Sequence, residues 1–352
     1  MSMSRIDQVN RQARQNVPNS STQMQSFAST DRGQILIIGE ALLDCFGDTM
    51  VPGGAPFNVA RTLGAFGIAP HLITRIGEDS AGARLLDQFH RFGLPVAGVQ
   101  RDGVRPTGMV VVKSNAAGHT FTIGANAAWD AIDPVAAAAL VQQLSPSIIC
   151  FGTLAQRAPT SRAAVAAVLE KTTALRVLDL NLRPTADHME IAAWSLLHAD
   201  VVKVNDDELA QLLKWFVPAF APASAVPPWT GALQLRAIET LAGKFLWRNL
   251  VVTCGPHGYV AFDVQGKLVA RGDAPQSTVV DTVGAGDGFL AIMMLGESLG
   301  WPLDQALERA SHFATDVCTI RGAVADKPAF YDRWAAKWNL SNARSPSIAT
   351  AT

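Results

Sequence analysis

The sequence predicts an α/β fold: a mainly parallel, doubly wound sheet covered by helices, with a small antiparallel β lid. Short β-branched runs such as "ILIIG" (35–39) and "DVVKVN" (200–205) end in Gly or Asn, which is typical of buried strands. Ala- and Leu-rich helical stretches separate these runs, and this alternation indicates a parallel sheet with helices on both faces. One region alternates instead around the turn "NAAG", which predicts a hairpin outside the main sheet.

The ordered domain is expected to span residues 34–340. Segment 1–33 is rich in Gln, Ser and Asn and has no apolar stretch, so we expect a disordered tail rather than a secretory signal. An amphipathic organelle-import segment is the alternative for it. Residues 341–352 are expected to form a second disordered tail. Within the ordered domain, the further predicted strands are "HLITRIG", "SIICFG", "RVLDL" and "NLVVTCG". The predicted helices are "SAGARLLDQFHRFG", "PVAAAALVQQL", "SRAAVAAVLEKTTA" and "ADHMEIAAWSLLHA".

The lid is expected to come from about residues 44–52 and 104–126. The second segment contains the hairpin pattern, and "LLDCFGDTMVPGG" supplies further strands beside it. Two ordinary edge strands are the alternative. The Pro- and Ala-rich stretch 215–231 is expected to be a surface loop, because its prolines disfavour a regular element.

Composition excludes several classes of partner. The 352 residues carry a formal net charge of -1 without a basic block, which argues against nucleic acid or a membrane surface as partner. Four scattered cysteines form no C-x-x-C pair, so they are expected to be core residues in a reducing compartment, and we expect a cytoplasmic protein. No segment reaches the roughly eighteen apolar residues that a membrane span needs.

The stretch "DTVGAGDGF" (281–289) carries the chemistry. Gly284, Ala285 and Gly286 precede an apolar helical run, so their backbone amides open a helix and form an anion site. Asp287 inside that turn is not suited to attracting a phosphate, and it makes better sense as the base for an attacking hydroxyl. A helix-capping Asp is the alternative. The P-loop motif fails at Phe245 and the dinucleotide fingerprint fails at Phe289.

"DTVGAGDGF" resembles the C-terminal signature of the ribokinase-like (PfkB) carbohydrate kinases, and "GGAPFNVARTLGAFG" (53–67) resembles their N-terminal signature. The motifs "GEALLD", "GEDSAG", "DLNLRP", "NDDEL", "TCGPHG" and "RGA" also match in order between about residues 34 and 330. Several ordered motifs are more specific than any single one. The resemblance implies a ribokinase-like fold, ATP and Mg2+ as cofactors, and a lid that closes over the sugar.

The resemblance also implies roles for individual residues. The catalytic group is Asp287, with Gly284, Ala285 and Gly286 as the anion hole. The substrate-binding group is Asp44 at the end of the first strand, Gly53, Gly54, Asn58 and Arg183. The nucleotide-binding group is Asn205, Thr253, Gly255, Gly258, Gly286 and Ser311.

Two cation sites follow from the same resemblance. Asn205 and Glu208 form an N-x-x-E element that is expected to organise Mg2+ through water, although a capping box fits the same spacing. Asp281, Val283 and Gly322 stand where relatives build a monovalent-cation site, for which K+ is the candidate.

The substrate is expected to be a free sugar, with fructose as the leading candidate, because "PTGMVVV", "FTIGANAAWD" and "DLNLRP" most resemble fructokinases. A 2-keto-3-deoxygluconate kinase is the alternative, and Arg183 is shared by both groups. A nucleoside or sugar-phosphate kinase would need additional cations near the lid, where Lys113 and Arg105 are the candidates. A catalytically idle relative is a further alternative. A homodimer through the exposed face of the lid is also expected.

Overall fold

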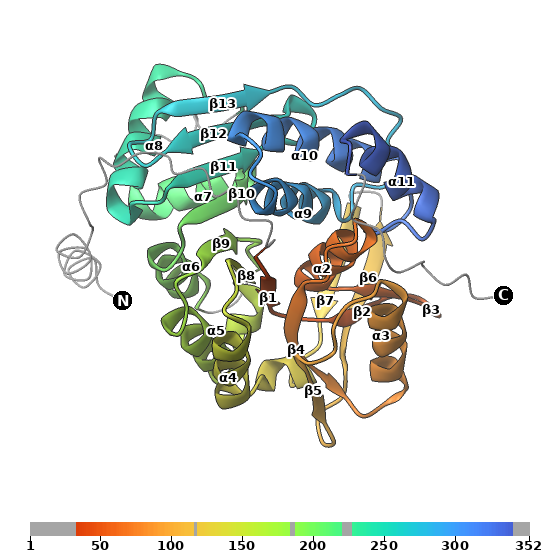
Figure 1. Cartoon of the computed structure of the whole chain (residues 1–352). Helices are drawn as coiled ribbons and strands as arrows, with labels where there is room; N and C mark the ends of the chain where they lie inside the picture. The colour runs from red at the N-terminus through yellow and green to blue at the C-terminus, as the bar shows by residue number, and fades with distance from the viewer. Residues whose placement is uncertain (1–32, 116–117, 184–186, 220–226, 341–352) are drawn as a thin grey trace.

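The computed structural model describes residues 33–115, 118–183, 187–219 and 227–340. A nine-stranded sheet runs through the molecule in the order β13-β12-β11-β10-β9-β8-β1-β4-β5 (Figure 1). Its strands are β1 (Ile35–Ile38), β4 (His71–Gly77), β5 (Val99–Asp102), β8 (Ile148–Gly152), β9 (Leu175–Asp179), β10 (Val201–Asn205), β11 (Asn249–Thr253), β12 (Tyr259–Asp263) and β13 (Leu268–Gly272). The strands from β11 to β5 are parallel, and β12 and β13 extend one edge as antiparallel strands. The predicted mainly parallel sheet is confirmed.

Ten helices cover the two faces of this sheet within the described residues (Figure 1). One face carries α2 (Ala55–Ala65), α3 (Ser80–Arg91), α9 (Ala285–Ser298), α10 (Leu303–Val317) and α11 (Pro328–Lys337). The other carries α4 (Pro134–Leu144), α5 (Pro159–Glu170), α6 (His188–Leu197), α7 (Asp206–Phe216) and α8 (Ala232–Phe245). Short 3-10 turns lie at η1 (Ala128–Ala131), η2 (Leu154–Arg157) and η4 (Gly255–His257).

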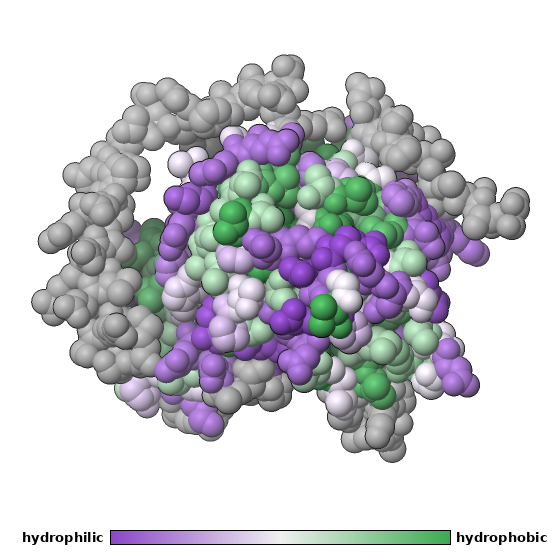
Figure 2. All heavy atoms as spheres, turned by 90° about the horizontal axis from the view of Figure 1, so that it is seen from below, coloured by the Kyte–Doolittle hydropathy of each residue, from purple (hydrophilic) through white to green (hydrophobic). Residues whose placement is uncertain are grey.

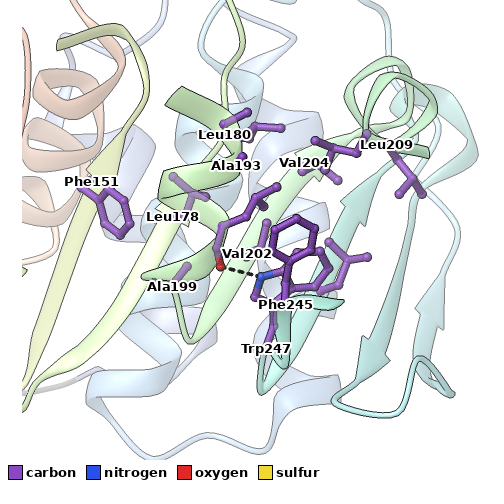
Figure 3. Close-up of a cluster of buried hydrophobic side chains, with 14 of the residues drawn as sticks. Phe151, Leu178, Leu180, Ala193, Ala199, Val202, Val204, Leu209, Phe245 and Trp247 are labelled. Carbon is purple, nitrogen blue, oxygen red and sulfur yellow. Dashed lines mark hydrogen bonds between the residues drawn. The ribbon is translucent and has the colours of Figure 1, made fainter. Parts of the chain in front are cut away.

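The core is divided between these faces by the two-residue period of the strands. In β1, Leu36 and Ile38 belong to the cluster with α4 to α8, whereas Ile35 and Ile37 belong to the cluster with α2 and α9 to α11. Figure 3 shows part of the first cluster, in which Phe245 stacks on Trp247 with ring centroids 5.2 Å apart. A buried strand therefore appears in the sequence as a continuous apolar run.

A separate four-stranded sheet, which we name the lid, has the order β3-β2-β6-β7. Its strands are β2 (Leu42–Phe46), β3 (Thr49–Gly53), β6 (Gly108–Asn115) and β7 (Gly118–Ile123). The pairs β2–β3 and β6–β7 are antiparallel hairpins, and a parallel pairing of β2 with β6 joins them. The two predicted lid segments therefore meet in one small sheet.

The prediction of a surface loop over 215–231 was wrong at both ends. The first two residues form the end of α7, and Phe216 is buried against Phe245. Trp229 is 0% exposed and belongs to the core cluster under α8. Burial of a large aromatic side chain contributes a favourable free energy, and prolines in the segment do not prevent it. Both ends of the stretch therefore pack on the core. Residues 220–226, residues 1–32 of the predicted tail 1–33, and the predicted tail 341–352 lie outside the described residues.

In the described part of the chain, no helix has the length and apolar character to cross a bilayer. A band of hydrophilic residues runs across the face shown in Figure 2 and separates smaller apolar areas.

Candidate active site

The predicted anion hole lies at the N-terminus of α9. Gly284 is the N-cap, with φ of 80°, and an added Cβ there would lie 2.3 Å from the Cα of Ala323. Only glycine tolerates both the left-handed backbone and this close approach. Ala285, Gly286 and Asp287 form the first turn of the helix, where backbone N–H groups lack intrahelical acceptors and the dipole favours an anion. The predicted helix start is confirmed.

Asp287 is held by a residue from the opposite end of the chain. The Nδ2 of Asn58, on α2, donates a hydrogen bond of 2.7 Å to the Oδ2 of Asp287. Burial and the carboxylate of Asp179 raise the pKa of Asp287 to about 6, against the lowering effects of Asn58, Lys203 and Arg183. The side chain is therefore largely ionised above pH 7 and basic enough to accept a proton.

A buried ion pair lies beneath the first turn of α9. Lys203 on β10 is the direct neighbour of Asp179 on β9, and its Nζ donates a 2.8 Å hydrogen bond to Oδ1 of Asp179. An added Cβ on Gly286 would lie 3.3 Å from the Nζ, so the ammonium group lies against the first turn of α9. Burial alone would lower the pKa of Lys203, but Asp179 and Glu208 outweigh it and raise the pKa above its usual value. The site thus contains a permanent positive charge.

A small cavity lies at the carboxyl ends of β1, β8 and β9. The chain leaves β1 toward β4 on one side and returns through β8 on the other, and ligands of open α/β sheets bind at such a point. Its polar lining includes Glu40, Thr153, Asp179 and Asn181. Burial raises the pKa of Glu40 to about 7, and the carboxylates of Asp287 and Asp179 add to the rise.

Asp44 was predicted at the end of the first strand, and this was wrong. It lies in the middle of β2, in the lid. The chain leaves the central sheet after Ile38 and starts a new strand at Leu42, because the apolar run is interrupted by Gly39 and Glu40. Burial raises the pKa of Asp44 to about 6, against the attraction of two arginines.

Glycines make room beside Asp44 and at the start of α2. An added Cβ on Gly53 would lie 2.0 Å from the Oδ2 of Asp44, so this glycine leaves space for the carboxylate. Gly54 caps α2 with φ of 99°, and a Cβ there would lie 2.7 Å from the carbonyl oxygen of Glu40. Arg183 follows β9 with an exposed side chain, and its charge lowers the pKa values of Asp44 and Asp287.

Asn205 and Glu208 form the capping box that was the alternative to the metal role. The Oδ1 of Asn205 accepts from the N–H of Glu208 at 2.8 Å, and the Oε2 of Glu208 accepts from the N–H of Asn205 at 2.9 Å. The Oε1 of Glu208 also accepts from the N–H of Leu182 at 2.8 Å, which fixes the loop that carries Arg183. This carboxylate still has lone pairs that can accept from metal-bound water.

The residues expected at the nucleotide come from β10, β11, η4, α9 and α10. Thr253 ends β11 and is the register partner of Asn205 on β10. Gly255 begins η4 with φ of 51°, and Gly258 caps its end with φ of 77°, which is backbone that favours glycine. Ser311 is buried on α10, the helix packed against α9.

The three residues predicted for a monovalent cation lie together. The Oδ1 of Asp281 accepts from the N–H of Val283 at 3.1 Å, and its Oδ2 accepts from the N–H of Gly322 at 3.0 Å. Asp281 thereby joins the loop before α9 to the loop after α10. Within the described residues, no group of three or more His, Cys, Asp or Glu side chains could by itself hold a metal ion.

Sequence reasoning missed the charged residues behind the site: Glu40, Arg61, Asp179 and Lys203. Two of them were visible as charges inside apolar strand runs, Asp179 in "RVLDL" and Lys203 in "DVVKVN". A charge in a strand that is covered on both faces needs a partner, and this signal could have identified the pair.

The chain is similar to known carbohydrate kinases. The profile of the pfkB family of carbohydrate kinases matches residues 33–329. Fructokinase-2 of Oryza sativa subsp. japonica is 27% identical over 311 residues, covering 83% of this chain and 86% of the relative. The aminoimidazole riboside kinase of Salmonella typhimurium is 25% identical over 327 residues, covering 84% and 92%.

A solved structure shares the fold. It is a double mutant of the fructokinase from Vibrio cholerae O395 in its fructose-, ADP- and potassium-bound form. It superposes with a TM-score of 0.69 at 20% identity and covers 86% of this chain and 99% of that chain. The family profile spans most of the sequence and includes both signature stretches. This chain therefore belongs to the pfkB family of carbohydrate kinases.

Proposed function

We propose that this kinase transfers the γ-phosphoryl group of ATP to a hydroxyl of a free sugar, that fructose is the acceptor, and that Asp287 is the base. The supporting observation is the Asn58–Asp287 hydrogen bond at the start of α9. It places an ionisable carboxylate among the first backbone amides of a helix. Glu40 and Asp179, which line the cavity, both interact electrostatically with Asp287.

In the proposed step, the sugar oxygen forms a bond to the γ-phosphorus while the bond from that phosphorus to the leaving ADP oxygen breaks. The hydroxyl proton passes to the carboxylate of Asp287. The amides of the first turn of α9, at Gly284 to Gly286, stabilise negative charge on the transferred group. Lys203, which lies against Gly286, adds a fixed positive charge.

The donor set suits a magnesium ion that arrives with the nucleotide. Mg2+ retains several waters and takes few protein ligands beside substrate phosphates, and Asn205 and Glu208 offer oxygen atoms for such waters. The ion would supply charge neutralisation on the phosphates. We assign the nucleotide to the edge formed by Asn205, Thr253 and η4, with Ser311 on α10 beside the adenine.

A monovalent ion is proposed at Asp281, Val283 and Gly322. The carboxylate of Asp281 joins the two loops that flank the start of α9. The fructokinase of Vibrio cholerae is described with potassium bound. Replacing K+ by tetramethylammonium in the assay is expected to lower kcat, and unchanged turnover would contradict this site.

A neutral, hydroxyl-rich substrate suits the charges of the pocket. Carboxylates accept hydrogen bonds from sugar hydroxyls but repel phosphate, and Glu40, Asp44 and Asp287 are all near the cavity or the lid. Of the two cations considered for a phosphorylated substrate, Arg105 is bound to Asp102 in its own turn. The side chain of Lys113 lies outside the described residues.

Two other substrates have specific support. The carboxylate of 2-keto-3-deoxygluconate could pair with the exposed Arg183. An aminoimidazole riboside is the substrate named for one relative. Both are carbohydrates with a free hydroxyl, so the same site could accept either one.

We also propose that the lid pairs with the lid of a second copy. Met50, Met109 and Val111 are 39%, 44% and 45% exposed, and the strand register places all three on one face of the lid. Replacing both Met109 and Val111 by Asp should lower the molar mass measured by light scattering from dimer to monomer. A wild-type protein that is monomeric at micromolar concentration would refute the pairing.

The deciding experiment measures ADP release with ATP, Mg2+ and a panel of acceptors. Fructose, 2-keto-3-deoxygluconate, aminoimidazole riboside and fructose 6-phosphate distinguish the candidates by kcat/KM. We expect fructose to have the highest value and D287N to be inactive. No ADP with any acceptor would favour an idle relative, and an active D287N would remove Asp287 from its role.

A further inference from the structure

A chain of two hydrogen bonds runs from Arg61 to the base. The Nη2 of Arg61 donates to the Oδ1 of Asn58 at 2.6 Å, and the Nδ2 of Asn58 donates to Asp287 at 2.7 Å. Arg61 and Asn58 lie three residues apart on α2, so both side chains project from one face of the helix.

The groups of Arg61 and Asp287 fix the orientation of the Asn58 amide between them. A guanidinium group only donates hydrogen bonds, and an ionised carboxylate only accepts them. The amide of Asn58 therefore has one satisfactory orientation, with its oxygen toward Arg61 and its NH2 toward Asp287. The reverse orientation would place the amide oxygen against the carboxylate of Asp287.

The same nitrogen of Arg61 also contacts the lid. Its Nη2 donates to the carbonyl oxygen of Pro52 on β3 at 2.8 Å, immediately before Gly53. One guanidinium nitrogen thus joins the lid strand to the residue that orients the base.

Packing holds this guanidinium in place. Arg61 is 4% exposed, and its Cζ lies 4.9 Å from the ring centroid of Phe57 and 5.8 Å from that of Phe92. Burial lowers the pKa of Arg61 to about 10, so the group remains charged at neutral pH. Burial of a cation costs free energy unless hydrogen bonds compensate for the lost water. The Nη2 of Arg61 makes such bonds to the lid residue Pro52 and to Asn58, which contacts Asp287.

We propose that Arg61 is a positioning residue that couples the lid strand to the catalytic base, because it orients Asn58 toward Asp287 while it holds Pro52. This inference rests on the proposed role of Asp287. It assigns to Arg61 a function in turnover that the resemblance to known kinases did not supply.

The test compares R61M with a matched control on the same lid strand. Arg84 on α3 donates from Nη2 to the carbonyl oxygen of Met50 at 3.2 Å, so R84M removes an arginine tether to β3 without altering Asn58. R61M is expected to lower kcat by roughly 10- to 100-fold, because small displacements of reacting groups cost this much. R84M is expected to stay within about twofold of wild type.

The pH profile separates positioning from a general loss of folded enzyme. R61M removes a positive charge and the donor that fixes the amide of Asn58, so the acid limb of kcat/KM should move to higher pH. The other charged groups that act on Asp287 remain in both variants: Glu40, Asp179, Arg183 and Lys203. A merely structural role would lower the active fraction and leave the acid limb in place.

A second variant covers the case in which R61M does not fold. R61K keeps the charge and the aliphatic stem but not the planar group that reaches both acceptors, so it should also lower kcat. Ethylguanidine should restore turnover to R61A but not to D287N. If R61M or R61K keeps the kcat and acid limb of wild type, the inference is overturned. If the wild type phosphorylates no acceptor, or if D287N remains active, the proposed function itself fails.

Discussion

Replacing Asp287 by Asn should make the protein inactive and more stable. Asn has nearly the same size, remains neutral, and can still accept the hydrogen bond from Nδ2 of Asn58. The change removes only the charge that proton transfer requires. Loss of a positioned general base lowers kcat by roughly 10²- to 10⁴-fold.

The gain in stability follows from the direction of the pKa shift. Burial and Asp179 raise the pKa of Asp287 from 3.8 to about 6 in the folded protein. The folded state therefore binds this proton more tightly than the unfolded chain, and the contribution of the group to stability falls as pH rises between these values. Above pH 6 the ionised carboxylate costs up to about 3 kcal/mol, and at pH 5 it costs about 1.5 kcal/mol.

Urea unfolding, followed by tryptophan fluorescence at pH 7.5 and pH 5, measures this cost, and ADP release measures turnover. The free energy of unfolding of D287N should exceed that of wild type by up to about 3 kcal/mol at pH 7.5 and by about half as much at pH 5. A D287N protein that is less stable at pH 7.5, or an advantage that does not shrink at pH 5, would refute the electrostatic reasoning.

Three further predictions test the surrounding structure. K203M leaves the buried carboxylate of Asp179 without its cation and should lower the free energy of unfolding by about 3–5 kcal/mol, whereas D179N together with K203M should recover stability in urea but not ADP release. G284A places a Cβ 2.3 Å from a backbone atom and requires φ of 80°, so its melting temperature and turnover should both fall. Gly243, in the middle of α8, is the matched control, because no atom lies within 4 Å of an added Cβ there. G243A should therefore raise the melting temperature. W229A removes a side chain that is 0% exposed and should cost about 3–5 kcal/mol in urea unfolding, whereas a surface loop would lose almost nothing.

The central sheet and the start of α9 could be predicted because their signals are local. A strand covered on both faces is a continuous apolar run, and "ILIIG" or "NLVVTCG" shows this without knowledge of its neighbours. The glycine at position 284 indicates a left-handed backbone, and Asp287 is a carboxylate in the first turn of the helix. Both lie within one short motif. The position of Asp44 was predicted wrongly because the strand break after Ile38 depends on where the lid begins.

The sequence by itself determined the kinase family, the strand–helix alternation and the identity of the residues at the start of α9. Only the tertiary structure decided which side chains meet there: Asn58 contacts Asp287, 229 residues away, and Lys203 on β10 pairs with Asp179 on β9. Such contacts depend on strand order and register, which many distant residues set together. A pattern within one segment specifies the conformation of that segment, whereas the partner of a buried charge is specified by the packing of the whole domain.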